Sequence, residues 1–164
     1  MRTKNAIKNI SFAWLAQLVF AFFGFIGPKI IIENYGSQVN GLTATILQIL
    51  SAVALIEAGA AGATIYALYS PLVSKNWTKV NEIVADLKAF YKKIGIIFAI
   101  ISFAIAPVFS YYIVKTDLSR NEVLIAFILL SLTNCFEFFF GAIYRVTLSA
   151  DQKMYVISIA LILE

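Results

Sequence analysis

Long apolar stretches separated by short polar segments form the dominant pattern of this chain. Four of them, at residues 10–32, 42–69, 94–114 and 123–144, reach or exceed the ~20 residues that cross the hydrocarbon core of a bilayer. A fifth begins at residue 155 and runs to 164, about half of a span. The pattern predicts an all-α, polytopic transmembrane helix bundle. We expect the chain to be the front part of a longer protein, with a complete short protein as the alternative.

The connections between the spans carry turn signals. In the segment IENYGSQVNG, at 32–41, the residues Gly36, Asn40 and Gly41 predict a turn too short to hold a domain. Pro71 is expected to stop the helix of the second span, because proline lacks the backbone N–H that continues a helix.

Two helix starts are predicted from the spacing of capping residues. Ser119 and Glu122 are three residues apart, as in a capping box that would open the fourth span. Ser149 and Gln152 have the same spacing ahead of the fifth apolar stretch.

Residues 77–92 have the pattern of an amphipathic helix that runs into the third span. Apolar side chains recur at intervals of three and four, at Trp77, Val80, Ile83, Val84, Leu87, Phe90 and Tyr91. The opposite face carries Lys79, Glu82, Asp86 and Lys93. Two interpretations stay open: a helix lying on the inner membrane surface with its aromatic residues at headgroup depth, or a helix packed under the protein's own bundle.

Composition agrees with a membrane protein and removes several kinds of chemistry. The chain is 61% hydrophobic and 13% charged, with a mean hydropathy of +0.86, whereas soluble domains carry about 25% charged residues. It has no histidine, and its one cysteine, Cys135, falls in the fourth span. We therefore expect no disulfide framework, no metal site, no cofactor and no enzyme activity, since nothing pairs a nucleophile with a base.

The net charge of +4 acquires a meaning from where the basic residues fall. Ten of the 13 lie before the first span, between the second and third, or between the fourth and fifth, and three lie on the opposite side. This positive-inside bias predicts a cytoplasmic N-terminus in the cytoplasmic membrane, with lipid headgroups rather than nucleic acid as the partner of the basic residues.

Two carboxylates lie inside predicted spans. Glu57 is close to the centre of the second and Glu137 is near the centre of the fourth, both within roughly 5 Å of mid-membrane at 1.5 Å per residue. An ionised carboxylate facing lipid there would cost about 2 to 4 kcal/mol. Each residue is therefore expected either to be hydrogen-bonded to a neighbouring helix for structural reasons, or to line a water-filled transport cavity.

Other polar and small residues extend this candidate site. Ser131, Asn134, Glu137, Gly141 and Arg145 fall on one stripe of the fourth span, so Asn134 and Arg145 could satisfy Glu137. Arg145 alone is also explained as an anchor at the inner surface. Beside Glu57, the small residues Ala58, Gly59, Gly62 and Ala63 would let another helix approach closely. In the first span Gln17 shares a face with Trp14, Ala21, Gly24 and Pro28.

Two segments resemble a known family. EAGAAGATIYALYSPLV, at 57–73, and YRVTLSADQKMYV, at 144–156, resemble the polysaccharide-biosynthesis flippases of Gram-positive bacteria, which share a superfamily with multidrug extruders and peptidoglycan-precursor flippases. RTKNAIKNISF at the N-terminus and the NYGSQVNGL turn follow the same style. Glu57 matches the acidic position of the family's Glu-x-Gly segment, and Asp151, Gln152 and Lys153 match its inner turn.

The resemblance implies a two-lobed, MATE-like fold of twelve or more helices around a cavity that opens alternately to each side. This chain would be most of the first lobe, would need the C-terminal lobe as its partner, and would carry lipid-linked oligosaccharide precursors to the outer leaflet. The candidate cavity or coupling residues are Glu57, Glu137, Asn134, Gln17 and Arg145. The alternatives are a proton- or sodium-coupled multidrug extruder of the same superfamily and a small non-transporting membrane protein.

Overall fold

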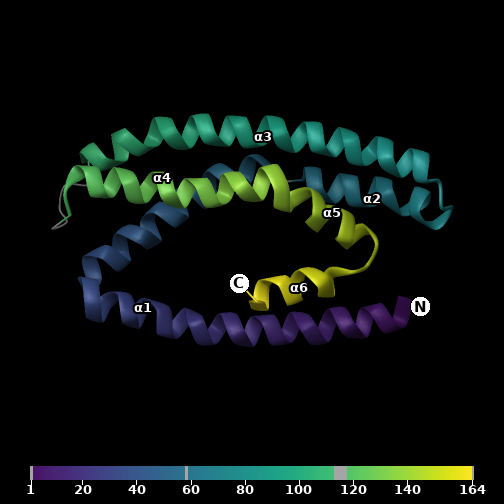
Figure 1. The fold of residues 1–164 in the computed structure, drawn as a ribbon, viewed down its shortest axis with the longest axis horizontal. Coiled ribbons are helices and arrows are strands. Elements are labelled where there is room, and N and C mark those ends of the chain that lie inside the picture. Colours follow the sequence, from purple (N-terminus) through teal and green to yellow (C-terminus); the bar gives the residue numbers. More distant parts are fainter. Residues whose placement is uncertain (1, 58, 113–117, 164) are drawn as a thin grey trace.

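The computed structural model describes residues 2–57, 59–112 and 118–163, with side chains from residue 5 onward. Its elements are α1 (Arg2–Ala54), the 3₁₀ turn η1 (Leu55–Glu57), α2 (Ala60–Val73), α3 (Trp77–Tyr112), α4 (Arg120–Phe136), the π-helical turn η2 (Glu137–Gly141), α5 (Ala142–Ala150) and α6 (Met154–Leu163). Figure 1 shows them as a bundle of elongated helices running back and forth. The described residues contain no strand, which confirms the all-α prediction.

Three helical stretches in the described part of the chain are long and apolar enough to cross a membrane: Asn5–Glu57, Trp77–Tyr112 and Arg120–Ala150. Shorter apolar helices cover Ala60–Val73 and Met154–Leu163. The predicted third span ends, and the fifth stretch stops, at residues that lie outside the described ranges.

The helix α1 consists of two arms that meet at Gly36. Its backbone there has φ 84° and ψ 162°, a conformation that side chains with a Cβ rarely adopt. We call residues 5–35 the first arm and 37–54 the second arm. The predicted turn is therefore real but is confined to one residue, since Asn40 and Gly41 are helical.

The second predicted span, 42–69, is broken in its middle. Regular α-helix ends at Ala54, the 3₁₀ turn η1 follows, and α2 starts after Gly59, whose φ of 94° again requires glycine. Pro71 does not stop α2, which continues to Val73. The prediction of one continuous helix was wrong because hydropathy does not register such a change of backbone conformation.

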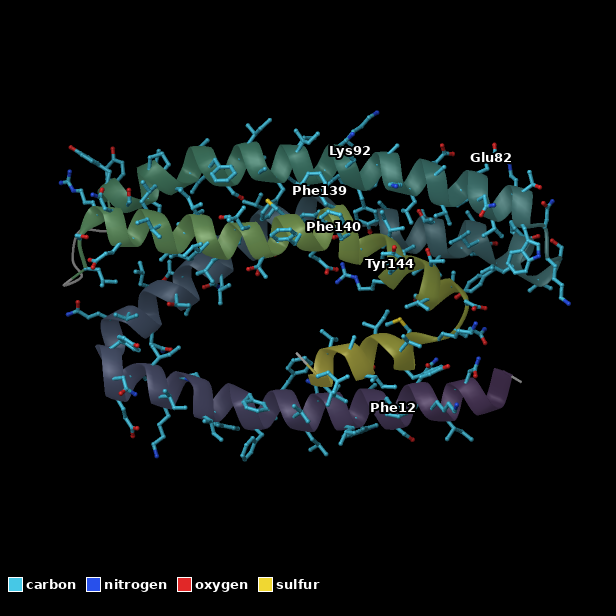
Figure 2. All side chains as sticks on the ribbon, viewed as in Figure 1. Phe12, Glu82, Lys92, Phe139, Phe140 and Tyr144 are labelled. Carbon is cyan, nitrogen blue, oxygen red and sulfur yellow. The ribbon has the colours of Figure 1, made fainter. Side chains whose placement is uncertain are left out.

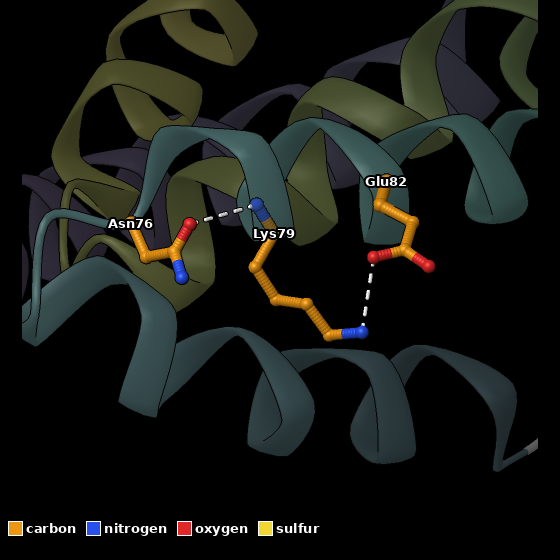
Figure 3. A network of polar contacts seen from close by, with 3 residues as sticks. All are labelled: Asn76, Lys79 and Glu82. Atoms are coloured by element: carbon orange, nitrogen blue, oxygen red, sulfur yellow. Dashed lines mark hydrogen bonds and ion pairs between the residues drawn. The ribbon is translucent and has the colours of Figure 1, made fainter.

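The third span and the amphipathic segment before it form one helix, α3. At 1.5 Å per residue its 36 residues extend ~54 Å, well beyond the ~30 Å of hydrocarbon. The Asn76 side-chain oxygen accepts a hydrogen bond from the Lys79 N–H at 3.1 Å and so caps the helix, while the Lys79 ammonium pairs with Glu82 at 3.0 Å (Figure 3). Its apolar face packs against Leu68 of α2, which favours the helix packed on its own bundle.

The main core lies between the second arm, α3 and α4. Tyr91, Phe98 and Phe127 are fully buried there. The Phe98 ring lies 5.1 Å from that of Phe138, centroid to centroid. Cys135 is buried in the same cluster, as expected of a small core residue.

The two predicted capping boxes have different outcomes. The Ser119 hydroxyl accepts from the Glu122 N–H at 3.3 Å, and the Glu122 carboxylate accepts from the Ser119 N–H at 2.7 Å, which confirms the box at the start of α4. The box at Ser149 and Gln152 was wrong. There α5 continues to Ala150, and the start of α6 receives its cap from Asn9 of the first arm.

The connections between helices lie at the ends of the bundle where a chain that crosses a membrane in alternating directions would place them. The N-terminus, the α2–α3 connection and the α5–α6 turn lie toward one end of the bundle, and the bend of α1 lies at the other (Figure 1). The segments predicted to carry the inner basic residues therefore share one end.

Candidate functional site: a cluster of ionisable side chains

Arg145 joins the two carboxylates that the sequence places inside predicted spans. Its Nη2 lies 3.6 Å from Glu57 Oε1 and 3.3 Å from Glu137 Oε1. The three residues come from η1, η2 and α5, so the contact joins the turn after α1 to the region that follows α4. The prediction that Arg145 could satisfy Glu137 agrees with the second distance, whereas the contact of Arg145 with Glu57 was not predicted.

Tyr91 completes the cluster from α3. Its hydroxyl donates to Glu57 Oε1 at 2.6 Å, a short hydrogen bond to an acceptor of carboxylate type. Tyr91 is fully buried and the Glu57 side chain is 17% exposed, whereas those of Glu137 and Arg145 are 44% and 46% exposed. Glu57 is thus the enclosed member and Glu137 the open one. We call these four residues the ion cluster.

The break in the second span explains the position of Glu57. In a continuous α-helix, the 3.6-residue period would turn the Glu57 side chain away from the residues that it contacts here. The 3₁₀ turn ends at Glu57, and the positive φ of Gly59 then starts α2 in a new direction. Glu57 therefore sits at the junction between two helices, where a single side chain can reach both α3 and α5.

The π turn brings Glu137 and Arg145 onto one line. A π turn contains about one residue more than an α turn, so two successive turns span roughly eight residues instead of about seven. Glu137 and Arg145 are eight apart in sequence and consequently lie one above the other.

Two glycines make room around η2. A Cβ added at Gly141 would lie 2.7 Å from the Glu137 carboxyl carbon, so glycine leaves the space that this carboxylate fills. A Cβ at Gly95 would meet the Phe139 ring at 3.1 Å. Figure 2 shows Phe139 between the η2 region and α3, while Lys92 projects away from the bundle. The η2 turn thus places Phe139 toward α3 and the Glu137 carboxylate toward α5.

The ion cluster opens onto a pocket of about 350 Å³ between the α4–α5 region and α6. One wall carries Glu137, Tyr144 and Arg145, and the opposite wall is the apolar side of α6, formed by Val156, Ile157, Ala160 and Leu161. Such a pocket suits an amphipathic ligand, with polar atoms toward the arginine and an apolar chain toward α6.

Two candidate residues lie elsewhere. The Asn134 amide donates to the Leu130 carbonyl of its own helix at 3.3 Å, so the expected bond to Glu137 is not the one that it makes. Gln17 is exposed on the first arm, where it lines a separate shallow hollow with Ala13 and Trp14. The shared polar face of a helix did not show whether a side chain forms its hydrogen bond within its own helix or with another helix.

The small residues beside Glu57 act differently from the prediction. Among the described residues, no atom lies within 4 Å of a Cβ added at Gly59 or Gly62, so none of the described helices packs closely against these two positions. Gly59 instead supplies the positive φ at the start of α2. Ala58 lies outside the described residues.

Sequence reasoning missed the role of Tyr91, which it placed among aromatics at headgroup depth. The available signal was its position on the same helix face as Leu87 and Ile94, both of which are buried. It also missed Asn9, whose sequence context offers no such signal.

The cluster contains two carboxylates and one guanidinium. With both carboxylates ionised its formal charge is −1, and one proton or one monovalent cation would balance it. No group of three or more His, Cys, Asp or Glu in the described part of the chain has the arrangement of a metal site. The cluster therefore has a charge that binding of one proton or one monovalent cation would neutralise, and an anionic group would compete with the carboxylates for Arg145.

The two segments that carry the family resemblance, 57–73 and 144–156, supply the two ends of the Glu57–Arg145 pair. Comparison of the chain with protein-family models, with curated proteins and with solved structures finds no match.

Proposed function

We propose that this chain is the first lobe of a membrane transporter that moves lipid-linked oligosaccharide precursors across the cytoplasmic membrane, with its N-terminus in the cytoplasm. The observation that carries the proposal is that Arg145 bridges Glu57 and Glu137 at the edge of a pocket with one charged wall and one apolar wall. A lipid-linked sugar has an anionic, polar head and an apolar chain, and it needs both kinds of wall.

The depth of the ion cluster supports a role at entry from the inner leaflet. From Tyr91 to Tyr112, α3 rises ~31 Å, about the thickness of the hydrocarbon core. If Tyr112 lies at the outer interface, Tyr91 and its partner Glu57 lie near the inner boundary and not at mid-membrane. Ionised side chains are less costly there, and headgroups of the inner leaflet are within reach.

The charge balance suggests how the site would work. While both carboxylates are ionised, Arg145 is already paired and the pocket repels anions. Protonation or displacement of Glu137, the more exposed carboxylate, would free one side of the guanidinium for the anionic group of the substrate. The Tyr91 bond would keep Glu57 in place meanwhile.

The test uses the full-length gene. Glu137→Gln should keep the protein in the membrane and change surface polysaccharide export, and Glu57→Gln should reduce export strongly. Glu33→Gln is the matched control, because Glu33 is an exposed acid whose ion pair is with Lys29 on its own helix. Normal export with either cluster variant would contradict the proposal, whereas loss of the protein from the membrane would assign Glu57 a structural role.

The formal negative charge of the cluster also favours a second candidate, a cation-coupled multidrug extruder. In that case one proton or sodium ion would occupy the site between the carboxylates. Deletion of the full-length gene should then raise cellular accumulation of a fluorescent cationic drug and leave surface polysaccharide unchanged. The opposite pair of results would favour the flippase.

A further inference from the structure

Asn9, on the first arm, holds both sides of the turn that leads into α6. Its Nδ2 donates to the Gln152 carbonyl at 3.0 Å, and its Oδ1 accepts from the Tyr155 N–H at 2.9 Å. The second bond satisfies a backbone donor in the first turn of α6, the position that a capping residue normally serves. Here the cap comes from a residue 146 positions away in the sequence.

Lys8 and Phe12, which lie close to Asn9 on the first arm, both contact Tyr155 at the start of α6. The Lys8 ammonium lies 5.2 Å from the centre of the Tyr155 ring, and the Phe12 ring is centred 6.3 Å from it. One turn of the first arm thus binds the start of α6 through a hydrogen bond, a cation–π contact and a ring contact. We call Lys8, Asn9, Phe12, Gln152 and Tyr155 the arm joint.

Apart from the first arm, little within the described residues fixes α6. The helix has ten residues and no buried side chain, and an isolated helix of that length is only marginally stable in water. It packs along the first arm, as Figure 1 shows, and meets α5 mainly across the turn. The position of α6 therefore follows the first arm more closely than it follows the main core.

The side chains of α6 that face α5 form the apolar wall of the pocket described above. Val156 and Ile157 follow directly after Tyr155, and Ala160 and Leu161 are one turn further on. Any change in the angle at the arm joint changes the distance between this wall and Arg145.

We propose that Asn9 is a positioning residue that makes the first arm and α6 one unit and thereby sets the width of the pocket beside the ion cluster. The inference rests on the proposed function for what the pocket binds, whereas the contacts of Asn9 are independent of it. The unit is connected to the remaining helices through two residues with positive φ, Gly36 at 84° and Gln152 at 58°. In the described part of the chain no atom lies within 4 Å of a Cβ built on Gly36, so nothing there packs against the bend.

Distances between spin labels on the full-length protein in lipid nanodiscs test the proposal. Labels at Leu163→Cys and Phe136→Cys measure the separation of α6 from α4, and Leu163→Cys with Phe25→Cys measures its separation from the first arm. All three positions are exposed, and Cys135→Ala removes the thiol of this part of the protein, with any cysteine elsewhere in the full-length protein replaced as well. Asn9→Ala should broaden both distributions, lowering the ratio of docked to undocked α6 by about fivefold, because the cap is lost.

Two further variants sharpen the result. Asn9→Asp keeps the acceptor for Tyr155 and places a negative charge at a helix N-terminus, but it loses the donor to Gln152, so an intermediate effect is expected. Asn34→Ala is the matched control, because Asn34 lies on the same arm and its amide donates to the Ile30 carbonyl of its own helix at 2.8 Å. It should leave both distributions as they are in the wild type.

The outcomes separate this inference from the proposed function. Unchanged distances in Asn9→Ala, or equal broadening in Asn34→Ala, would overturn the positioning role. Broadened distances together with a lower rate of sugar export would support both proposals. Broadened distances in a protein that exports no lipid-linked sugar, even as wild type, would retain the arm joint and remove the flippase.

Discussion

The main core and the unit formed by the first arm and α6 have similarly apolar sequences but opposite surroundings. Tyr91, Phe98 and Phe127 in the core are fully buried, whereas Phe25 on the first arm is 83% exposed. Ala16 is the one buried side chain in the described part of the first arm. Apolar composition therefore does not distinguish side chains that face protein from those that would face lipid. The core is held by packing of buried side chains, whereas the unit is held by the arm joint and by packing of α6 along the first arm.

The largest expected difference between the two regions comes from removing an aromatic ring. Phe98→Ala leaves a cavity beside Phe138 and should lower the free energy of unfolding by about 3 to 5 kcal/mol. Phe25→Ala on the first arm should change it by less than about 0.5 kcal/mol. Reversible unfolding in mixed micelles measures both, and equal losses would show that the arm is buried in the folded protein.

Ion pairs should separate the regions by a smaller amount. Arg145→Gln leaves the enclosed Glu57 without its cation, and we expect a loss of about 2 kcal/mol, between the values for buried and surface pairs. Lys29→Gln breaks an exposed 3.8 Å pair on the first arm and should cost less than about 0.5 kcal/mol. The double variant with Glu57→Gln should recover part of the Arg145→Gln loss, and no recovery would contradict direct coupling.

Replacing glycine with alanine should lower the free energy of unfolding in one region and raise it in the other. Gly141→Ala places a methyl group where the Glu137 carboxylate lies and should destabilise by about 1 kcal/mol, despite the better helix propensity of alanine. Gly24→Ala, on the first arm, meets nothing within 4 Å and should stabilise by up to about 1 kcal/mol. Thermal unfolding of the two variants in one detergent compares them, and a stabilising Gly141→Ala would disprove the tight fit around Glu137.

The smallest effect is expected in alkali at the turn before α6. The Asp151 carboxylate accepts a hydrogen bond from Lys153 at 2.6 Å and so raises the pKa of that ammonium. A raised pKa means that the stabilisation is complete below the ordinary pKa of lysine and is lost as the pH rises through the raised value. We expect this pair to help hold the turn ahead of α6, so raising the pH should broaden the α6–α4 label distance, and Asp151→Asn should shift the midpoint of that broadening to lower pH. An unchanged midpoint would show that the pair does not contribute to the position of α6.

Much of the fold follows from hydropathy and capping rules. The helical class, the bend at Gly36 and the capping box at Ser119 could all be predicted, because each depends on a local pattern or on the special backbone of one residue. The break between Ala54 and Ala60 could not, because the surrounding sequence stays apolar enough for one continuous span and the change lies in the backbone at η1 and Gly59.

The candidate site was predicted in part for the same reason. An unpaired carboxylate inside a membrane span is costly, so Glu57 and Glu137 could be recognised as candidate residues from their apolar sequence surroundings. Tyr91 and Asn9 did not, because their partners are 34 and 146 residues away and the contacts arise from packing between helices. Asn134 and Gln17 show the converse, since a polar residue in a span often satisfies itself locally or remains at a surface.

The π turn at Glu137–Gly141 makes the chain tolerant of the loss of one codon. Deleting one residue among Phe138–Phe140 would let the backbone return to ordinary α-helical bonding without breaking the helix. Glu137 and the arginine would then be seven residues apart, about two turns of a regular α-helix, and would still lie one above the other. An in-frame deletion of three nucleotides should thus keep the charged contact in a protein that still folds as a helical bundle.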